Sequence, residues 1–363
     1  MWDGQVAHED PDIAKLRSRF VCVRITSLNK VDINRFQFDY DTTWNAFFLD
    51  AKLNIYSRYG GRDDGEPEDR ISKASLMQTM REVLAAHTNR QSKPAPGLPP
   101  IYQPVKGERK IPDDIPLLKK SHQGCVHCHQ VREYRFLQWA HDGEFDRSKL
   151  FAYPLPEGIG IEFDRKHGHK ISKLLKDSAA TKAKLEVGDV VVAVDNIPTR
   201  SEYDVRWALG KVKKDARSIR IMVQRGDPQK VVEVALKPTG KWRESELGWR
   251  KSMRSLPLSR GFSGYPLTKS QRRTLGLSPD KLAIKLTRSR EKGLALNLGL
   301  KKADVILSIA GNDRERWYEE FLSDLVRLYK PGDTVKLTIL RDGKRQKLSG
   351  KFPKWQTEET SVP

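Results

Sequence analysis

At residues 187–195 the chain reads VGDVVVAVD, and this stretch decides the fold of the region around it. The glycine and the aspartate are typical turn residues, and the apolar run after them has the length of one buried strand. A turn that leads directly into a buried strand predicts the middle of a small sheet. The flanking segments must therefore supply the partner strands and the covering helices.

Strand and helix signals flank this central strand on both sides. A glycine loop, Gly158-Ile159-Gly160-Ile161, opens a strand that runs to residue 163. Apolar side chains at helical spacing predict a helix at residues 201–209. The remaining expected elements are a strand at 171–175, a helix at 178–185, and strands at 218–224 and 231–236. Residues 154–239 thus form one mixed domain.

The same succession recurs about a hundred residues later. Ala303-Asp304-Val305-Ile306 matches Gly188-Asp189-Val190-Val191, and a helix (319–328) and two strands (334–340 and 347–352) follow it. The turns before the last strand also match, because VQRG at 223–226 corresponds to ILRDG at 339–343. An internal repeat of this kind predicts a second domain of the same fold at residues 255–353.

Both repeats are similar to the circularly permuted PDZ domains of bacteria. That resemblance implies capture of a protein or of a C-terminal peptide as an added strand. The loop residues Gly158, Ile159, Gly160 and Ile161 would hold the terminal carboxylate, and Val205, Ala208 and Leu209 would line the side-chain pocket. A loop that only makes a domain contact is the alternative. In the second repeat the matching stretch, residues 282–286, has no glycine, so packing or dimerisation is expected there.

The N-terminal residues 1–90 show a different order of elements. A helix around 12–20 precedes the strand-like run 20–25, and a hairpin (44–49 and 53–59) and a helix ending near 89 follow. This order resembles the thioredoxin fold, with Cys22 as a core residue. The C-x-x-C of that family is missing after the predicted central strand, so a redox-inactive domain is expected.

Five residues, Cys125-Val126-His127-Cys128-His129, carry the one reactive constellation that the sequence offers. The spacing C-x-x-C-H is typical of covalent c-type haem attachment, in which two thiols bind the porphyrin and the histidine binds iron. Cys125 and Cys128 would bind the haem, and His129 would be its iron ligand on the same helical turn. Residues 118–150 are therefore predicted to be a short helical haem-binding segment.

Two other chemistries suit this segment. His122 and His127 add donors to the cluster, so zinc or copper is the alternative cofactor. A redox-active dithiol is the third interpretation. The second axial ligand of the haem stays open: His141 is too far along the helix, and the further candidates are His87, Met77, Met80, His167 and His169.

Composition limits the remaining function classes. The chain has 363 residues, which suits several domains, and a net charge of +20. No nucleic-acid motif accompanies the basic residues, so nucleic-acid binding is not expected. No apolar run is long enough for a transmembrane helix, and residues 1–10 lack an export signal. Haem attachment would nevertheless require export, so the periplasm is the expected location.

Tandem PDZ domains also suggest a trypsin-like periplasmic protease. Gly261-Phe262-Ser263-Gly264 is faintly similar to the nucleophile loop of that family. The protease needs two barrels with histidine and aspartate before this serine. The thioredoxin-like domain and the first PDZ domain occupy that part of the chain, so residues 261–264 are expected to be an ordinary loop.

The fold class predicted from these signals is a multidomain α+β chain: a thioredoxin-like domain (1–90), a proline-rich linker (91–117), the haem-binding segment, two PDZ β-barrel-like domains and a tail (354–363). The predicted function is that of an exported c-type haem protein in electron transfer or in redox or ligand sensing, docked to its partners by PDZ domains. The alternative is a non-catalytic periplasmic scaffold or adaptor with a structural metal. The chain is not expected to be an enzyme. A redox partner and assembly into a homo-oligomer are expected.

Overall fold

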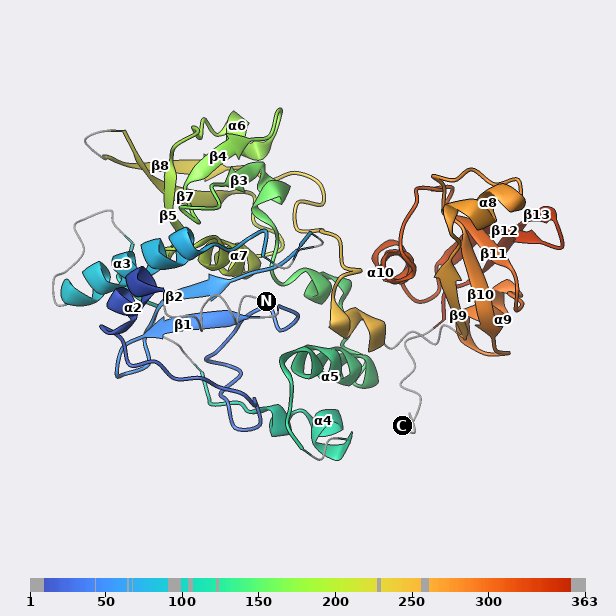
Figure 1. The fold of residues 1–363 in the computed structure, drawn as a ribbon, viewed down its shortest axis with the longest axis horizontal. Helices are drawn as coiled ribbons and strands as arrows, with labels where there is room; N and C mark the ends of the chain where they lie inside the picture. The colour runs from blue at the N-terminus through green and yellow to red at the C-terminus, as the bar shows by residue number, and fades with distance from the viewer. Residues whose placement is uncertain are drawn as a thin grey trace. The chain divides into compact units, whose positions relative to one another are not determined.

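The computed structural model describes residues 10–42, 44–63, 65–66, 68–90, 99–103, 107–121, 124–226, 230–255 and 261–353 (Figure 1). The chain divides into two compact units. The first unit holds Met1–Asp114, Cys125–Cys128 and Leu150–Ser245, and the second holds Ile115–Gly124, His129–Lys149 and Glu246–Pro363. The predicted tail at 354–363 lies outside the described residues.

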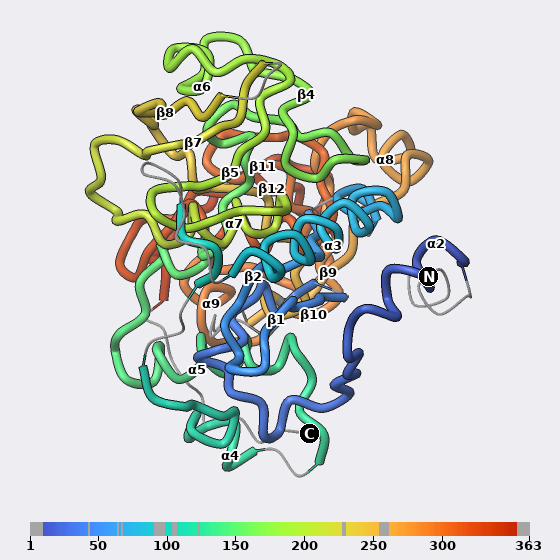
Figure 2. The backbone as a smooth tube through the Cα atoms, turned by 90° about the vertical axis from the view of Figure 1, so that its left-hand side faces the viewer, coloured from blue at the N-terminus to red at the C-terminus, as the bar shows by residue number. Residues whose placement is uncertain are grey.

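The N-terminal part of the first unit is built on one hairpin. β1 (Asn45–Leu49) pairs antiparallel with β2 (Ile55–Gly60), as the sequence predicts. α3 (Lys73–Thr88) begins at Ser72, whose hydroxyl accepts the Ser75 amide in a capping box. α3 lies beside β2 in both views (Figure 1, Figure 2) and buries Leu76 and Met80 against the hairpin. A short helix, α2 (Pro11–Arg17), precedes the hairpin.

The predicted thioredoxin-like domain is wrong. Residues 21–28 form no strand, and the hairpin is a sheet of only two strands. Val21 and Val23 are 95% and 79% exposed, and Cys22, predicted to be core, is exposed as well. An alternating apolar run becomes a buried strand only where neighbouring strands supply hydrogen bonds and cover its apolar face. No strand of the described chain pairs with residues 20–25.

The described residues 99–103 and 107–114 of the predicted linker (91–117) make contacts within the first unit. Gln103 and Ile55 exchange backbone hydrogen bonds of 2.8 and 3.2 Å, and Ile101 packs against the hairpin core. Further along, the Ile33 amide donates to the carbonyl of Lys110 (2.7 Å). Pro94, Pro96 and Pro104 lie outside the described residues. Residues 99–103 and 107–111 therefore lie in no helix or strand but are held by contacts, and a 3-10 helix, Pro112–Asp114, follows them.

The C-terminal part of the first unit has the elements that the sequence predicts for residues 154–239. A two-stranded sheet and a four-stranded sheet, in the order β6-β5-β7-β8, enclose one apolar core. The elements are β3 (Ile161–Phe163), β4 (Ile171–Leu174), α6 (Ala179–Lys182), β5 (Val190–Val194), β6 (Ile197–Pro198), α7 (Glu202–Lys211), β7 (Ile219–Arg225) and β8 (Lys230–Leu236).

The second unit repeats this succession with one continuous sheet, in the order β13-β12-β11-β10-β9. Phe262, Leu294, Phe321 and Val335 lie in its core. Its elements are β9 (Phe262–Pro266), α8 (Lys269–Thr274), β10 (Ile284–Ser289), α9 (Gly293–Leu298), β11 (Val305–Ile309), α10 (Tyr318–Leu328), β12 (Thr334–Arg341) and β13 (Lys344–Lys351). Two earlier helices, α4 (Pro116–Ser121) and α5 (Cys128–His141), complete the regular structure. A search of the described helices finds none that is long and apolar enough to cross a membrane.

The two repeats share an ion pair at the turn that opens the central strand. Asp189 accepts two hydrogen bonds from the Arg225 guanidinium, both 2.7 Å, and Asp304 accepts two from Arg341, also both 2.7 Å. Each aspartate also accepts the amide three residues before it, at 2.9 Å in the first repeat and 2.8 Å in the second. The matching VQRG and ILRDG stretches of the sequence therefore have the same structural role.

Candidate peptide-binding site

The glycine loop before β3 is a single turn of 3-10 helix, Pro156–Ile159, that ends at Gly160. Gly160 has a φ of +95°, and a Cβ added there would lie 2.1 Å from the side chain of Ser178. Both the backbone conformation and the close approach therefore require glycine. Ile159 and Ile161, on either side of Gly160, are fully buried. The turn thus fixes the loop backbone between two anchored apolar side chains.

β3 has one unpaired edge. It pairs with β4 through Ile161 opposite Leu174 and Glu162 opposite Lys173, and no other described strand pairs with it. An unpaired edge next to a glycine loop is the arrangement on which an extended peptide adds as a further strand. The predicted loop residues therefore lie where such a peptide would end.

The predicted pocket residues come together on α7. Its N-cap Ser201 accepts the Asp204 amide, and its apolar stripe faces the core. Val205, Ala208 and Leu209 belong to the same core cluster as Ile159 and Ile161, and all five are at most 1% exposed. The structure thus brings together every residue predicted to line the pocket. They form a closed apolar floor.

An ion-pair network connects the loop with the N-terminal part of the unit. The Arg70 guanidinium lies 2.6 Å from Glu157 in the loop, 3.0 Å from Glu202 at the start of α7 and 2.6 Å from Asp63. Burial alone would raise the pKa of the Asp63 carboxyl, but the charge of Arg70 lowers it overall. The sequence did not reveal this network because its members are distant in the chain: Asp63 and Glu202 are 139 residues apart.

A second buried contact holds the first turn of α7. The Asp204 carboxylate accepts hydrogen bonds from the Ser57 hydroxyl (2.6 Å) and the Arg58 amide (2.9 Å) of β2. The Arg58 guanidinium lies 3.8 Å from the same carboxylate and over the ring of Trp207. Asp204 and Arg58 are both at most 1% exposed. The hairpin of residues 45–60 therefore serves as a support for the helix.

A cavity of about 580 Å³ lies between α3 and the strands of the same unit. His167 and His169 line it, together with Glu82, whose carboxylate is 3.4 Å from His169 Nε2. His167 contacts Asp164. The two other histidines considered as haem ligands also have protein contacts: His87 Nδ1 is 3.2 Å from the Tyr56 hydroxyl, and His141 contacts Asp142. The partners of His169, His167, His87 and His141 in these contacts are thus Glu82, Asp164, Tyr56 and Asp142, and no serine hydroxyl is among them.

The second repeat corrects one assignment from the sequence. Residues 282–286, expected to correspond to the glycine loop, lead into β10, which is equivalent to β4. The equivalent of the loop and β3 is Gly261 followed by β9, where Gly261 has a φ of +69°. The stretch Gly261-Phe262-Ser263-Gly264 is therefore part of a sheet edge and not an ordinary loop. Aligning the first strand of each repeat, β3 and β9, would have identified Gly261 as the counterpart of the glycine loop.

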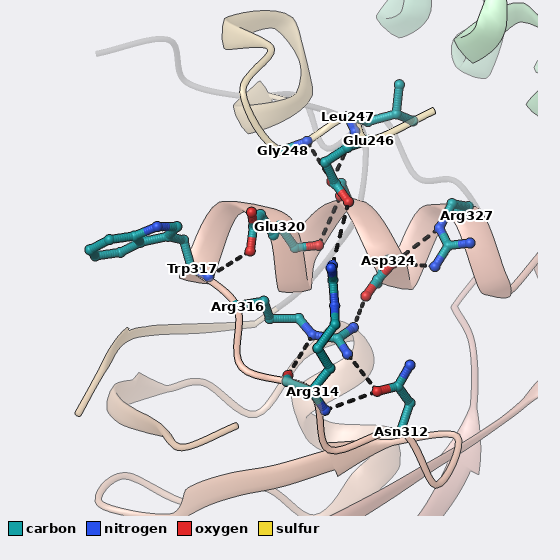
Figure 3. A network of polar contacts seen from close by, with 11 residues as sticks. Glu246, Leu247, Gly248, Asn312, Arg314, Arg316, Trp317, Glu320, Asp324 and Arg327 are labelled. Atoms are coloured by element: carbon teal, nitrogen blue, oxygen red, sulfur yellow. Dashed lines mark hydrogen bonds and ion pairs between the residues drawn. The ribbon is translucent and has the colours of Figure 1, made fainter. Parts of the chain in front are cut away.

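Residues 246–248 pack on α10 in the second unit (Figure 3). The Glu246 carboxylate accepts the amides of Leu247 and Gly248 and the hydroxyl of Ser323 on α10, each at 2.9 Å. A Cβ on Gly248 would lie 2.7 Å from the Cα of Glu320, so the two backbones touch. The helix that would line a second peptide site is thus covered on this side by the chain itself.

Beside these contacts, a charged cluster holds the loop before α10 to the helix (Figure 3). Arg316 pairs with Asp324 and also donates to the Asn312 side chain (2.9 Å). Arg327 donates to the other oxygen of Asp324, at 3.0 and 2.6 Å. At the start of α10, the Tyr318 hydroxyl donates to the carbonyl of Phe262 on β9 (3.2 Å). α10 and β9 are therefore already linked by a direct hydrogen bond.

The C-x-x-C-H segment does not form the single helical turn that haem attachment was predicted to use. Cys125 precedes α5 and is exposed, whereas Cys128 is its first residue and half-buried, and burial raises the pKa of the Cys128 thiol. The Val126 amide donates to the Asn29 side chain (2.7 Å), so the segment is tied to residues 28–29. Neither cysteine forms a disulfide with another cysteine of the described chain.

Metal binding at this segment has no geometric support either. No group of three or more histidine, cysteine, aspartate or glutamate side chains is arranged to hold a metal ion, within the residues that the structure describes. His122, one of the predicted donors, lies outside them. Val131 and Phe136 of α5 are buried.

The curated relatives are proteases. The chain is 24% identical over 191 residues to a probable periplasmic serine endoprotease DegP-like of Pseudomonas fulva, covering 52% of this chain and 38% of that protein. It is 26% identical over 192 residues to the protein of the same description in Pseudomonas savastanoi, with the same coverage. The chain thus spans about two fifths of the length of the relatives that it matches.

A solved structure described as the HtrA-type protease AlgW with decapeptide also matches. It is 17% identical, covers 37% of this chain and 48% of that chain, and has a TM-score of 0.22. A score this low does not establish a common fold for the two chains.

These relatives overturn three predictions. Both curated relatives are serine endoproteases, so a c-type haem protein in electron transfer or sensing is wrong, and so is the scaffold with a zinc or copper ion. The predicted redox partner has no support once the haem is removed. The expectation that the chain is not an enzyme is contradicted by the same names. The expected periplasmic location agrees with them.

The predicted PDZ fold, by contrast, is confirmed for the first repeat. A family model described as PDZ domain matches residues 158–236. The match begins at the glycine loop and ends with the last residue of β8, so it contains the unpaired edge of β3 and all of α7. Residues 158–236 of this chain are therefore a PDZ domain.

Proposed function

We propose that this chain acts in periplasmic proteolysis of the DegP type and that its PDZ domain captures substrates by their carboxy-terminal segments. The observation that carries the proposal is the glycine loop at 158–161, which leads directly into a strand with an unpaired edge. The names of the two curated relatives support the proteolytic setting.

In this proposal the substrate chain extends β3 in the antiparallel direction. The backbone amides of Gly158, Ile159, Gly160 and Ile161 receive its terminal carboxylate, and its last side chain points toward Val205, Ala208 and Leu209. An apolar last residue is the natural ligand, because these three side chains carry no polar group. Backbone hydrogen bonds provide affinity that does not depend on the sequence of the rest of the peptide.

Peptide capture is tested by fluorescence anisotropy with a labelled peptide that ends in a free carboxylate after valine. The full-length protein should bind it, and the amidated peptide should bind at least about tenfold more weakly, because it lacks the charged acceptor. Gly160→Ala should abolish most of the binding. Gly188→Ala is the matched control, since Gly188 also has a positive φ (+98°) but has open space around it. Equal affinity for both peptides would contradict capture of the carboxylate.

Proteolysis is tested separately by incubating the protein with denatured casein, with and without phenylmethylsulfonyl fluoride. Cleavage that the inhibitor stops would support a serine nucleophile in this chain, because activation of that hydroxyl by a histidine is what makes it react with such reagents. Binding of the free-carboxylate peptide without any cleavage would retain substrate capture and reject catalysis by this chain.

The second repeat is proposed to be a PDZ-like domain in a packing role. Its edge strand β9 is already bonded to α10 through Tyr318, and Glu246 and Gly248 pack on the helix. This agrees with the expectation from the sequence, although the sequence located the equivalent loop incorrectly.

A further inference from the structure

The chain does not leave the PDZ domain directly after β8. Residues 241–244 form a turn, closed by a hydrogen bond from the Glu244 amide to the Lys241 carbonyl (2.8 Å). The Trp242 side chain, at the centre of this turn, packs on the core cluster that contains Ile159 and Leu209. We name residues 241–244 the latch segment.

The latch segment touches the glycine loop through its backbone. A Cβ placed on Gly158 would lie 1.9 Å from the Trp242 carbonyl oxygen and 2.9 Å from its carbonyl carbon. No side chain larger than hydrogen fits there while the segment is in place. Gly158 is one of the four residues whose amides would receive the peptide carboxylate, so the contact is made at the carboxylate end of the site.

The latch segment also holds the far end of α7. The Arg243 guanidinium donates to the carbonyls of Val212 and Lys213, the latter at 3.2 Å. Carbonyls after the last helical turn lack intrahelical partners and carry partial negative charge, so a guanidinium is well placed there. The same guanidinium lies 4.4 Å from the centre of the Trp242 ring. One turn of chain therefore joins the two walls between which the peptide would end.

The 3-10 turn of the loop occupies some of its own backbone donors. The amide of Gly158 donates to Leu155 and that of Gly160 to Glu157, both at 3.0 Å. Two of the four amides that would bind a carboxylate are thus occupied within the loop. The side chains of Val205, Ala208 and Leu209 are at most 1% exposed, so the last side chain of a peptide can reach them only if neighbouring residues move.

We propose that residues 241–244 are an intramolecular latch that closes the carboxylate end of the PDZ peptide site, with Trp242 and Arg243 as its two contacts. The inference rests on the proposed function, because it concerns regulation of the same site. A peptide binds after the latch segment leaves the loop and the end of α7. The apparent affinity of the peptide is then lowered by the fraction of molecules in which the latch is closed.

The first test compares peptide affinities. Arg243→Ala removes the hydrogen bonds to α7 and leaves the core packing of Trp242, so it should tighten binding of the free-carboxylate peptide about tenfold. Arg243→Lys, which keeps the charge but not the fork of donors, should give a smaller gain. Arg220→Ala is the matched control: it also removes one guanidinium, but its contacts are with Asn196 and Glu233. Unchanged or weaker binding in Arg243→Ala would overturn the latch.

The second test separates the latch from peptide capture. Hydrogen exchange of the amides of residues 158–160 is measured without peptide in the wild-type protein and in Arg243→Ala. The variant should exchange these amides at least about tenfold faster, while amides of β5 and β7 keep their rates. Faster exchange without peptide binding in any variant would retain the closing contact and reject the proposed function. Peptide binding with unchanged exchange would retain the proposed function and reject the latch.

Discussion

The two repeats start from the same local pattern and use the first turn of their long helices differently. Asp204 in α7 and Glu320 in α10 occupy the same position, three residues after the N-cap. Asp204 turns into the protein and accepts hydrogen bonds from Ser57 and Arg58, whereas Glu320 accepts the Trp317 amide of its own helix. An acidic residue at this position is therefore a helix cap in one repeat and a docking contact in the other. The difference depends on what lies beside the helix.

The largest expected change in the free energy of unfolding comes from removing the acidic side chain at this position in each helix. Asp204→Ala leaves the Arg58 guanidinium buried without its carboxylate and should lower the free energy of unfolding of the first unit by about 3–5 kcal/mol. Glu320→Ala, the matched change in α10, should cost only about 1 kcal/mol, since it removes a half-buried cap. Urea denaturation followed by tryptophan fluorescence measures both. Equal losses would mean that the two helices are held in the same way.

The shared ion pair gives the next largest effect. Asp189→Ala and Asp304→Ala should each cost about 2–3 kcal/mol, because both aspartates are buried and each accepts two hydrogen bonds from one arginine. The two losses should appear in different units, which hydrogen exchange can locate. If both substitutions loosened the same strands, the equivalence of the two turns would be lost.

The pH dependence of stability should differ between the two units by less than the effects of the substitutions above. Asp63 has a lowered pKa in the folded first unit, because Arg70 outweighs the burial of the carboxyl. Its contribution to stability is therefore complete above the ordinary pKa of 3.8 and is lost as the pH falls below that value. We therefore expect the first unit to lose stability as the pH falls from 5 to 2, measured by urea denaturation as a function of pH. Asp63→Asn should remove this part of the pH dependence; an unchanged profile would contradict the assignment.

The smallest effect concerns the hydrogen bond that links α10 to β9. Tyr318→Phe removes one hydroxyl donor from the Phe262 carbonyl and should lower the stability of the second unit by about 0.5–1 kcal/mol. Peptide binding by the first repeat should stay as it is. A gain of a second peptide site in titrations would instead show that this bond is what keeps the second repeat in a packing role.

Local pattern was enough to predict both repeats. The turn at 187–195, its counterpart at 303–306 and the matching arginines at 225 and 341 are close in sequence to the strands that they organise. Their hydrogen bonds form within one domain, so the periodicity of the chain already contains the information. Gly160 was recognisable for the same reason, because the left-handed backbone of a short loop requires glycine there, whereas Gly158 is required by the distant Trp242 carbonyl.

Chemistry read from spacing alone was wrong where it depended on surroundings. The spacing C-x-x-C-H at 125–129 predicted a helical turn, but the helix begins only at Cys128. The apolar run at 20–25 predicted a central strand, but a strand needs neighbours that residues 21–28 do not have within the described chain. A motif states which donors are near in sequence, whereas helix boundaries and burial decide how they point.

The sequence by itself determined the two repeats, their matching turns and the glycine loop that makes the first repeat a peptide-binding candidate. Only the tertiary structure decided what supports and what closes that site. Arg70, Ser57 and Arg58 support it from the N-terminal part, whereas the Trp242 carbonyl touches Gly158 in the loop and Arg243 holds the end of α7. These contacts join residues tens to well over a hundred positions apart, and no local periodicity records them, because the chain has to be folded before they meet.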